Sequence, residues 1–214
     1  DNFSIYKFRD EKMTLGINLN HLHKMLKSIK KKDSIVLFIK HDMVSDLGIK
    51  VLPKENNRIT TSFIKIQNIQ NMDIDLPDGY SKPIIVPSNE YQKMCKDMNN
   101  ISGIISVISK GFYIKFLCNA GSVYSREVAF GEIEDDEEDA DDYDENEEEY
   151  NQNFDTEQLS RIIKLSGLSN NMQVFPKDGL PLLFKSNIGS LGKISVYIKS
   201  KTQIEDESLQ ENQE

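Results

Sequence analysis

The sequence lacks the motifs that mark common catalytic and cofactor sites. Its glycines form neither a Walker loop nor a G-x-G-x-x-G dinucleotide motif, and no G-x-S-x-G nucleophile elbow is present. The three histidines, His21, His23 and His41, have no partners at the spacing of metal ligands. We therefore expect a protein that is not an enzyme and that uses no metal or other cofactor.

Cysteines and long apolar runs are also scarce. Cys95 and Cys118 form no C-x-x-C pair and stand among apolar residues, which favours buried, reduced thiols over a disulfide or a metal site. No apolar run approaches the roughly 20 residues that a membrane-spanning helix needs, and the chain opens without a signal-peptide pattern. We expect a soluble intracellular protein with no membrane partner.

Acidic residues outnumber basic ones over the whole chain, but not outside two acidic segments. The formal charge is −9, with 26 basic and 35 acidic residues. Fourteen of the acids lie between Glu132 and Tyr150, and five more follow Lys201, with no Lys or Arg in either segment. The remaining body has 16 acids against 26 bases, so it can attract a polyanion.

A four-residue pattern of a basic residue, two apolar residues and a lysine occurs three times. Its copies start 69 and 68 positions apart and are Lys24–Lys27, Lys93–Lys96 and Arg161–Lys164. Residues three apart share a helix face, so each basic pair lies opposite the apolar pair. The spacing indicates one structural unit used repeatedly to present positive charge, although so short a pattern also occurs by chance on solvated helices.

Hydrophobic periodicity predicts short strands around three helices. The predicted helices are 20–30, 88–99 and 156–165. In the first, Leu22, Met25, Leu26 and Ile29 form the apolar stripe, with Lys24, Lys27 and Lys31 opposite. The predicted strands are 3–8, 13–17, 34–40, 47–52, 58–66, 83–87, 104–109, 112–118, 122–130, 172–175, 180–185 and 193–198. An α+β fold with cationic helices packed on antiparallel sheets follows.

Several segments, in order along the chain, resemble the proliferating cell nuclear antigen family, the DNA sliding clamps of eukaryotes and archaea. They are Leu15-Gly16-Ile17-Asn18-Leu19, Pro87-Ser88-Asn89-Glu90-Tyr91, Cys95-Lys96-Asp97, Leu180-Pro181-Leu182-Leu183 and Ile204-Glu205-Asp206-Glu207. Each match alone is weak, but together they run collinearly over almost the whole chain.

The resemblance implies a ring of antiparallel sheets whose bore is lined by short basic helices. Duplex DNA would then contact the basic side chains without sequence specificity, and those side chains are Lys24, Lys27, Lys31, Lys93, Lys96, Arg161 and Lys164. It divides the chain into the C-terminal part of a first clamp domain (1–66), a connecting loop (67–82), a second domain (83–201) with an acidic insertion (132–150), and an acidic tail (202–214). We expect the N-terminal part of the first domain to lie outside this sequence.

The family docks partner peptides in an apolar pocket, which the resemblance places at Ile74, Leu76, Pro77, Tyr197 and Ile198. The segment Tyr197-Ile198-Lys199-Ser200-Lys201 departs from the usual Tyr-Leu-Ala-Pro-Lys. The aromatic residue is kept, but the floor of the pocket and the choice of partner change. Ile74 and Leu76 could instead be ordinary packing residues of a linker.

Family members join head to tail through edge strands, which the resemblance assigns to Arg58–Ile66 and Ser122–Phe130. The acidic insertion follows directly on the second of these. We expect a nuclear homotrimer that a clamp loader places on double-stranded DNA and that tethers DNA polymerases and repair proteins carrying a docking peptide. The alternatives are a subunit of a checkpoint-type clamp, a divergent paralogue, or an acidic-loop interaction scaffold that does not encircle DNA.

Overall fold

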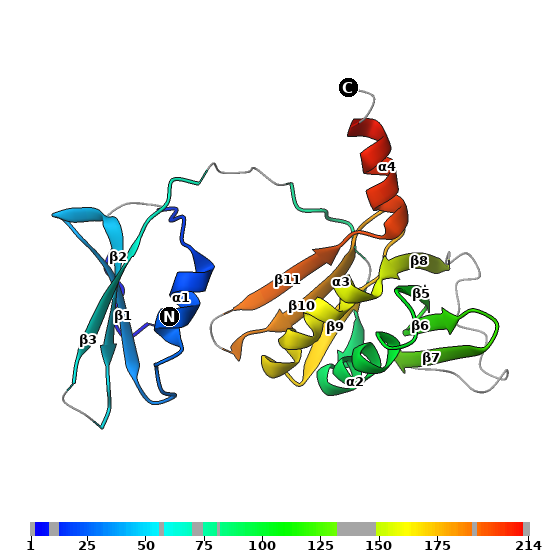
Figure 1. Ribbon diagram of the computed structural model, residues 1–214, viewed down its shortest axis with the longest axis horizontal. Coiled ribbons are helices and arrows are strands. Elements are labelled where there is room, and N and C mark those ends of the chain that lie inside the picture. The colour runs from blue at the N-terminus through cyan, green and yellow to red at the C-terminus, as the bar shows by residue number, and fades with distance from the viewer. Residues whose placement is uncertain are drawn as a thin grey trace. The chain divides into compact units, whose positions relative to one another are not determined.

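The chain forms two compact units, Phe3–Asp75 (unit 1) and Leu76–Glu214 (unit 2). The structure is a computed structural model, which describes residues 3–8, 13–55, 58–69, 75–80, 82–131, 149–189 and 192–211. Each unit combines antiparallel sheets with short helices, as Figure 1 shows. The predicted α+β class is confirmed.

Unit 1 is a three-stranded sheet with one helix. Helix α1 (Leu19–Leu26) is followed by β1 (Ser34–Lys40), β2 (Met43–Leu52) and β3 (Thr60–Lys65), which pair in the order β1-β2-β3. Asn18 caps α1, because its side-chain oxygen accepts the backbone N–H groups of Asn20 and His21. Gly48 in β2 lies against the ring of Phe38 in β1, so a side chain at position 48 would collide with it.

Unit 2 repeats one arrangement twice and ends in a helix. The first half contains β4 (Ile84–Pro87), α2 (Ser88–Met98), β5 (Ile104–Lys110), β6 (Tyr113–Ala120) and β7 (Tyr124–Gly131). The second contains β8 (Tyr150–Asp155), α3 (Thr156–Arg161) with a 3₁₀ continuation (Ile162–Gly167), β9 (Asn171–Phe175), β10 (Leu182–Asn187) and β11 (Lys193–Ile198). Helix α4 (Lys201–Glu211) follows.

The two halves of unit 2 exchange their first strands. The sheets have the orders β11-β10-β9-β4 and β7-β6-β5-β8, so β4 pairs with β9 of the second half and β8 pairs with β5 of the first. A single core joins both sheets to the helices, and Tyr91, Phe116, Phe154 and Phe184 are fully buried in it. Alternating buried and exposed residues along β5 and β6 fit sheets with one covered face.

A helix followed by three antiparallel strands occurs three times. The copies are α1 with β1–β3, α2 with β5–β7, and α3 with β9–β11. Each copy carries one of the three basic motifs on or directly after its helix. The repeat spacing in the sequence therefore corresponds to a repeated structural element.

The two predicted N-terminal strands are wrong. Among the described residues of 3–8 and 13–17, regular pairing is limited to an isolated bridge between Gly16 and Gln67. Alternating apolar residues favour an extended chain, but a strand also requires a partner with free N–H and C=O groups. Periodicity alone does not supply that information.

The predicted first helix was too long. It ends at Leu26 rather than Lys30, because the Asp33 carboxylate accepts the N–H of Lys30 at 3.0 Å, a group that helix continuation would direct to Leu26. Lys31 consequently lies in the turn after α1 and not on its face. None of the described helices has the length and apolar character needed to cross a membrane.

Two elements were not predicted. Strand β8 begins at Tyr150, the last residue of the predicted acidic insertion, and α4 forms within the predicted acidic tail. Ser200 and Gln203 begin α4 with a reciprocal pair of hydrogen bonds: Ser200 N–H to Gln203 Oε1 at 2.9 Å, and Gln203 N–H to Ser200 Oγ at 3.2 Å. The boundary between the two units along the chain lies between Asp75 and Leu76, within the expected connecting loop 67–82.

Candidate functional site

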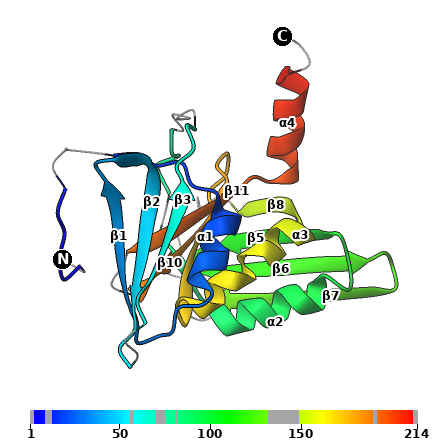
Figure 2. The same ribbon diagram turned by 60° about the vertical axis from the view of Figure 1, so that its left-hand side comes forward.

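In unit 2, helices α2 and α3 lie side by side over the sheets (Figure 2). Both helices carry basic residues. They are joined at their buried faces, where the Tyr91 hydroxyl donates to the Leu159 carbonyl oxygen at 3.2 Å. Cys95 lies against the same carbonyl, with its Sγ 4.0 Å away. This packing fixes the two helices against each other and leaves their outer faces in solvent.

The predicted basic residues lie on those outer faces. Lys93 and Lys96 of α2 are exposed, and so are Arg161 at the end of α3 and Lys164 in the 3₁₀ continuation. The apolar residues between them, Met94, Cys95 and Ile162, are buried, while Ile163 is half-buried against the core. The division of each motif into a basic and an apolar face is therefore confirmed for unit 2.

Unit 1 presents its own basic pair, Lys24 in α1 and Lys27 at the C-terminal cap of that helix. Lys24 and Lys27 are exposed, and Leu22 and Met25 on the other side are half-buried. Lys31, which we expected beside them, lies in the following turn and lines a different surface, on the loops that precede β1 and β3. The structure thus separates Lys31 from the helical pair.

Acidic neighbours distinguish the basic residues from one another. Lys93 Nζ lies 2.7 Å from Glu90 Oε1, and Arg161 Nη2 lies 2.9 Å from Glu157 Oε1. Within the described residues the structure records no ion pair for Lys24, Lys27, Lys96 or Lys164. Exposed pairs of this type contribute about 0–1 kcal/mol, so Lys93 and Arg161 can exchange their carboxylate partners for phosphates at small cost.

An aromatic cluster forms a second candidate site in unit 2. Tyr80 lies between Tyr197 of β11 and Phe175 of β9, with ring centroids 6.3 Å and 6.2 Å away. The Tyr80 hydroxyl donates to the Pro181 carbonyl oxygen at 2.7 Å. Burial, and to a smaller extent the neighbouring Tyr197, raises the pKa of Tyr80 to about 12, so this donor stays protonated at neutral pH.

The predicted pocket residues lie in different environments. Leu76 is 66 % exposed, Pro77 and Tyr197 are half-buried, and Ile198 is buried in the core. Ile74 lies outside the described residues. Tyr80 therefore fastens the segment 75–80 to the sheet on which Tyr197 lies, and Leu76 is an exposed apolar residue of that same segment.

Sequence reasoning missed Tyr80 and Phe175. Tyr80 is a lone aromatic residue after Pro77-Asp78-Gly79, a turn sequence, and an aromatic residue in a polar loop is a usable signal for anchoring. Phe175 gave no such signal, since it ends a predicted strand like any core residue. Its ring is buried, and the Lys185 ammonium nitrogen lies 4.8 Å from the ring centroid.

The two predicted subunit-contact segments coincide with edge strands. β3 ends the sheet of unit 1, and β7 ends one sheet of unit 2. Each leaves one side of its backbone without a partner strand within the described residues. Phe63 of β3 and Tyr124 of β7 are exposed, whereas Val128 of β7 packs partly against the core.

Metal and thiol chemistry receive no support from the described part of the chain. It contains no group of three or more His, Cys, Asp or Glu residues placed to hold a metal ion. Cys95 and Cys118 are buried and free. Burial raises the pKa of the Cys95 thiol to about 11, despite the hydrogen bond with Tyr91, and so disfavours the reactive thiolate.

Two family models together match residues 1–201 of the chain. Residues 1–76 match the N-terminal domain of proliferating cell nuclear antigen, and residues 75–201 match its C-terminal domain.

Similar proteins carry names of the same kind. A probable DNA polymerase sliding clamp of Paramecium bursaria Chlorella virus 1 is 26 % identical, over 92 % of this chain and 75 % of its own length. Proliferating cell nuclear antigen of Chaetomium thermophilum is 25 % identical, over 94 % of this chain and 77 % of its own. A probable DNA polymerase sliding clamp of Acanthamoeba polyphaga mimivirus is 23 % identical, over 92 % of this chain and 42 % of its own length.

Proposed function

Since the chain belongs to the proliferating cell nuclear antigen family, we propose that it is a DNA sliding clamp, a ring that encircles duplex DNA and tethers DNA polymerases. The observation that carries this proposal is the basic outer face of α2 and α3, repeated on α1. Its function is not catalytic: the ring raises the processivity of enzymes that bind it.

The basic faces explain how such a ring holds DNA and still moves. Lys24, Lys27, Lys93, Lys96, Arg161 and Lys164 end in flexible, exposed cations that suit phosphates, which recur along any duplex. Phosphate contacts fix the position of a protein on DNA without reading a base edge. Movement along the duplex then exchanges one set of equivalent contacts for the next. In this proposal Lys31 adds a further phosphate contact from the turn after α1.

The edge strands support assembly into a ring. Pairing of β7 in one subunit with β3 of the next leaves the same two edges free at the ends of any open chain of subunits, so only a closed ring satisfies all of them. We propose a homotrimer with Arg58–Ile66 and Ser122–Phe130 at the contacts. A checkpoint-type clamp of unlike subunits would instead leave this protein monomeric by itself in light-scattering chromatography.

Partner proteins dock at the aromatic cluster in this proposal. A short peptide with hydrophobic anchors would bind against Tyr197 and Leu76, with Ile74, Pro77 and Ile198 as supporting residues. The proposed domain bounds are 1–66, 67–82 and 83–201. Polymerases, repair proteins and a clamp loader are the proposed partners, and replication in the nucleus is the proposed setting.

Topology gives the decisive experiment. Clamp loaded by its cognate loader onto nicked circular DNA should co-elute with that DNA in gel filtration, and cutting the circle once should release it, because a ring slides off a free end. A clamp loaded on the circle should also lengthen the products of its polymerase on a primed template. Equal retention on circular and linear DNA would contradict the encircling mechanism.

A further inference from the structure

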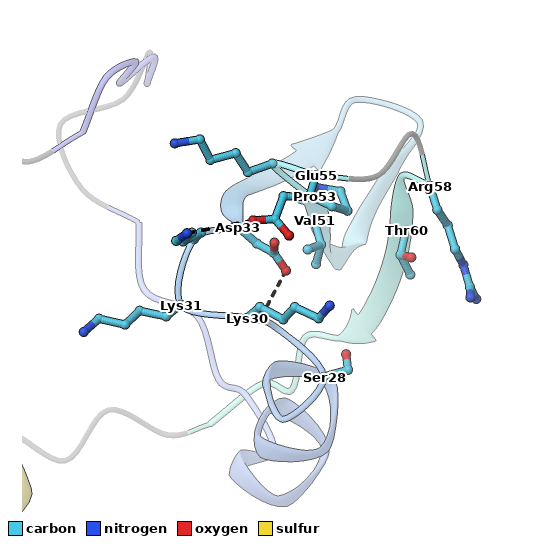
Figure 3. Close-up of a pocket in the computed structure, with 11 residues that line it drawn as sticks. Ser28, Lys30, Lys31, Asp33, Val51, Pro53, Glu55, Arg58 and Thr60 are labelled. Carbon is cyan, nitrogen blue, oxygen red and sulfur yellow. Dashed lines mark hydrogen bonds and ion pairs between the residues drawn. The ribbon is translucent and has the colours of Figure 1, made fainter.

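Five cations gather on two neighbouring loops of unit 1. They are Lys30, Lys31 and Lys32 in the turn between α1 and β1, and Lys54 and Arg58 in the loop between β2 and β3. All five line a cavity of about 510 Å³ (Figure 3). We call these five residues the basic cluster.

The acidic residues at this cavity neutralise little of the cluster. Asp33 accepts the backbone N–H of Lys30 at 3.0 Å, drawn as a dashed line in Figure 3. Glu55 lies 3.9 Å from Lys32 Nζ, and both side chains are about three-quarters exposed. Lys31 and Arg58 line the cavity with their inner atoms, and Figure 3 shows their charged ends directed away from it. Positive charge is therefore left over on the outside of these loops.

A segment of opposite charge follows edge strand β7. Residues 132–149 contain fourteen Asp and Glu residues and no Lys or Arg. The chain enters this segment through Gly131, whose φ of 100° is a conformation that favours glycine. A Cβ atom at position 131 would also collide with the Phe112 carbonyl oxygen. The end of β7 therefore requires glycine at position 131.

The proposed subunit contact brings these two features together. Every strand pair within the described residues is antiparallel. If β7 pairs in the same sense with β3 of the next subunit, centre on centre, its last residue Gly131 falls beside the start of β3 at Thr60. Arg58 and the rest of the basic cluster lie at that end of β3.

The acidic segment is long enough to cover the cluster. Strands β7 and β8 are the two edges of one four-stranded sheet, so their separation is roughly 14 Å at about 4.8 Å per strand. The 18 residues between Gly131 and Tyr150 can span roughly 60 Å when extended. The segment can therefore reach roughly 20 Å beyond the sheet edge and return.

We propose that the acidic segment 132–149 of one subunit binds the basic cluster of the next subunit. This rests on the proposed function, because it uses the β7–β3 contact of the ring. The segment is then a second, electrostatic part of the subunit interface, made of several exposed ion pairs. Its contribution falls with salt, since exposed pairs are screened within about 10 Å at 0.1 M.

Carbodiimide cross-linking tests the proposal on the full-length protein. Subunits labelled with ¹⁴N and ¹⁵N are mixed, allowed to exchange, cross-linked at low salt and digested for mass spectrometry. We expect Lys30, Lys31, Lys32 or Lys54 to be joined to acids of 132–149 in peptides of mixed isotope. The yield should fall at least fivefold in 0.5 M salt.

A charge-reversal pair gives a second readout. Lys30→Glu with Lys54→Glu should raise the dissociation constant of the assembled ring about tenfold at low salt, which corresponds to about 1.4 kcal/mol. Lys110→Glu with Lys193→Glu, on exposed positions of unit 2, is the matched control and should leave it within twofold.

The outcomes separate this inference from the proposed function. A ring of normal mass whose basic cluster gives no mixed-isotope cross-links to 132–149 overturns the inference and leaves the clamp intact. Cross-links confined to one isotope also overturn it. If Lys30→Glu with Lys54→Glu weakens duplex binding but not the ring, the cluster binds DNA phosphates instead. Absence of any oligomer contradicts the proposed function itself.

Discussion

At the scale of single residues, the basic faces are defined as much by their acids as by their lysines. Glu90 and Glu157 each share a helix face with one basic residue and pair with it. Lys24 and Lys96 have no such pair recorded in the described part of the chain. These two lysines are therefore the better probes of phosphate contact.

Reversing the charge of both probes should impair function without unfolding the protein. Lys24→Glu with Lys96→Glu changes exposed positions, where substitutions usually alter stability by about 0.5 kcal/mol or less. We expect normal melting but a loss of polymerase stimulation of about tenfold or more. Lys110→Glu with Lys193→Glu is the control. Wild-type stimulation by a normally melting Lys24/Lys96 variant would remove these helices from the DNA path.

Removing the two acids should have the opposite effect. Glu90→Gln with Glu157→Gln frees Lys93 and Arg161 from their carboxylates, each pair being worth about 0.2–1 kcal/mol. We expect affinity for a short duplex to rise about two- to fivefold in fluorescence anisotropy at 50 mM salt. Glu127→Gln, which removes an acid of β7, should leave the affinity unchanged. A fall in affinity would mean that Glu90 or Glu157 orders the site.

The aromatic cluster predicts a loss of peptide binding. Leu76→Ala and Tyr197→Ala should each weaken binding of a polymerase-derived docking peptide by more than about 2 kcal/mol, or roughly thirtyfold, in calorimetric titration. Val123→Ala is a suitable control, since Val123 is 90 % exposed in the β6–β7 turn. Affinities within twofold of wild type for both pocket variants would exclude this surface as the docking site.

Residue-level prediction succeeded where one face of a helix had to be buried. The placement of Lys93, Lys96 and Arg161 follows from the apolar residues between them, because Met94, Cys95 and Ile162 cannot be exposed without cost. Tyr80 and Phe175 were missed because their neighbours are distant in sequence. No local pattern shows that the hydroxyl of Tyr80 meets the carbonyl of Pro181, 101 residues later.

At the scale of elements, hydrophobic periodicity predicted most helices and strands. It failed for elements whose formation depends on a partner strand or on a helix cap. Ser88–Met98 and Ile104–Lys110 lie within a residue or two of their predicted bounds. β8 was hidden because Tyr150 adjoins an acidic run, yet its residues pair with β5 and bury Phe154. α4 depends on the Ser200–Gln203 cap, a signal present in the sequence but read only as an acidic tail.

Edge strand β7 offers a test of the subunit contact. Successive N–H groups of a strand point to opposite edges, so of Tyr124→Pro and Ser125→Pro one removes a donor facing β6 and the other a donor facing the free edge. We expect the variant that loses the N–H group facing the free edge to keep its melting temperature within a few degrees. The same variant should become monomeric in light-scattering chromatography.

The other proline variant serves as the matched control, because it weakens the β6–β7 ladder and lowers the melting temperature. Val128→Asp is less informative, since Val128 packs partly on the core and a charge there would damage the fold. Two folded variants that both keep the oligomer mass would show that β7 is not the contact strand.

At the scale of the whole molecule, the threefold repeat was predictable and the sheet order was not. Motifs 69 and 68 positions apart correspond to three helix-and-strand copies. Which strands become neighbours depends on pairings far apart in sequence, such as Ile84 with Val174, and hydrophobic patterning does not encode them. Periodicity supplied the class, helices packed on antiparallel sheets, and the family resemblance supplied the clamp fold.

The exchange of β4 and β8 between the halves of unit 2 has a consequence for how this unit folds. Neither half can complete its own sheet, because β4 pairs with β9 and β8 pairs with β5. The paired strands are far apart in sequence, so the entropy of closing the chain between them is lost before their hydrogen bonds can form. We therefore expect slow folding of unit 2 in one cooperative step. Native-state hydrogen exchange should therefore give amides of β4 and β8 the same opening free energy as those of β5 and β9. Independent opening of either half at lower free energy would contradict this interlocking.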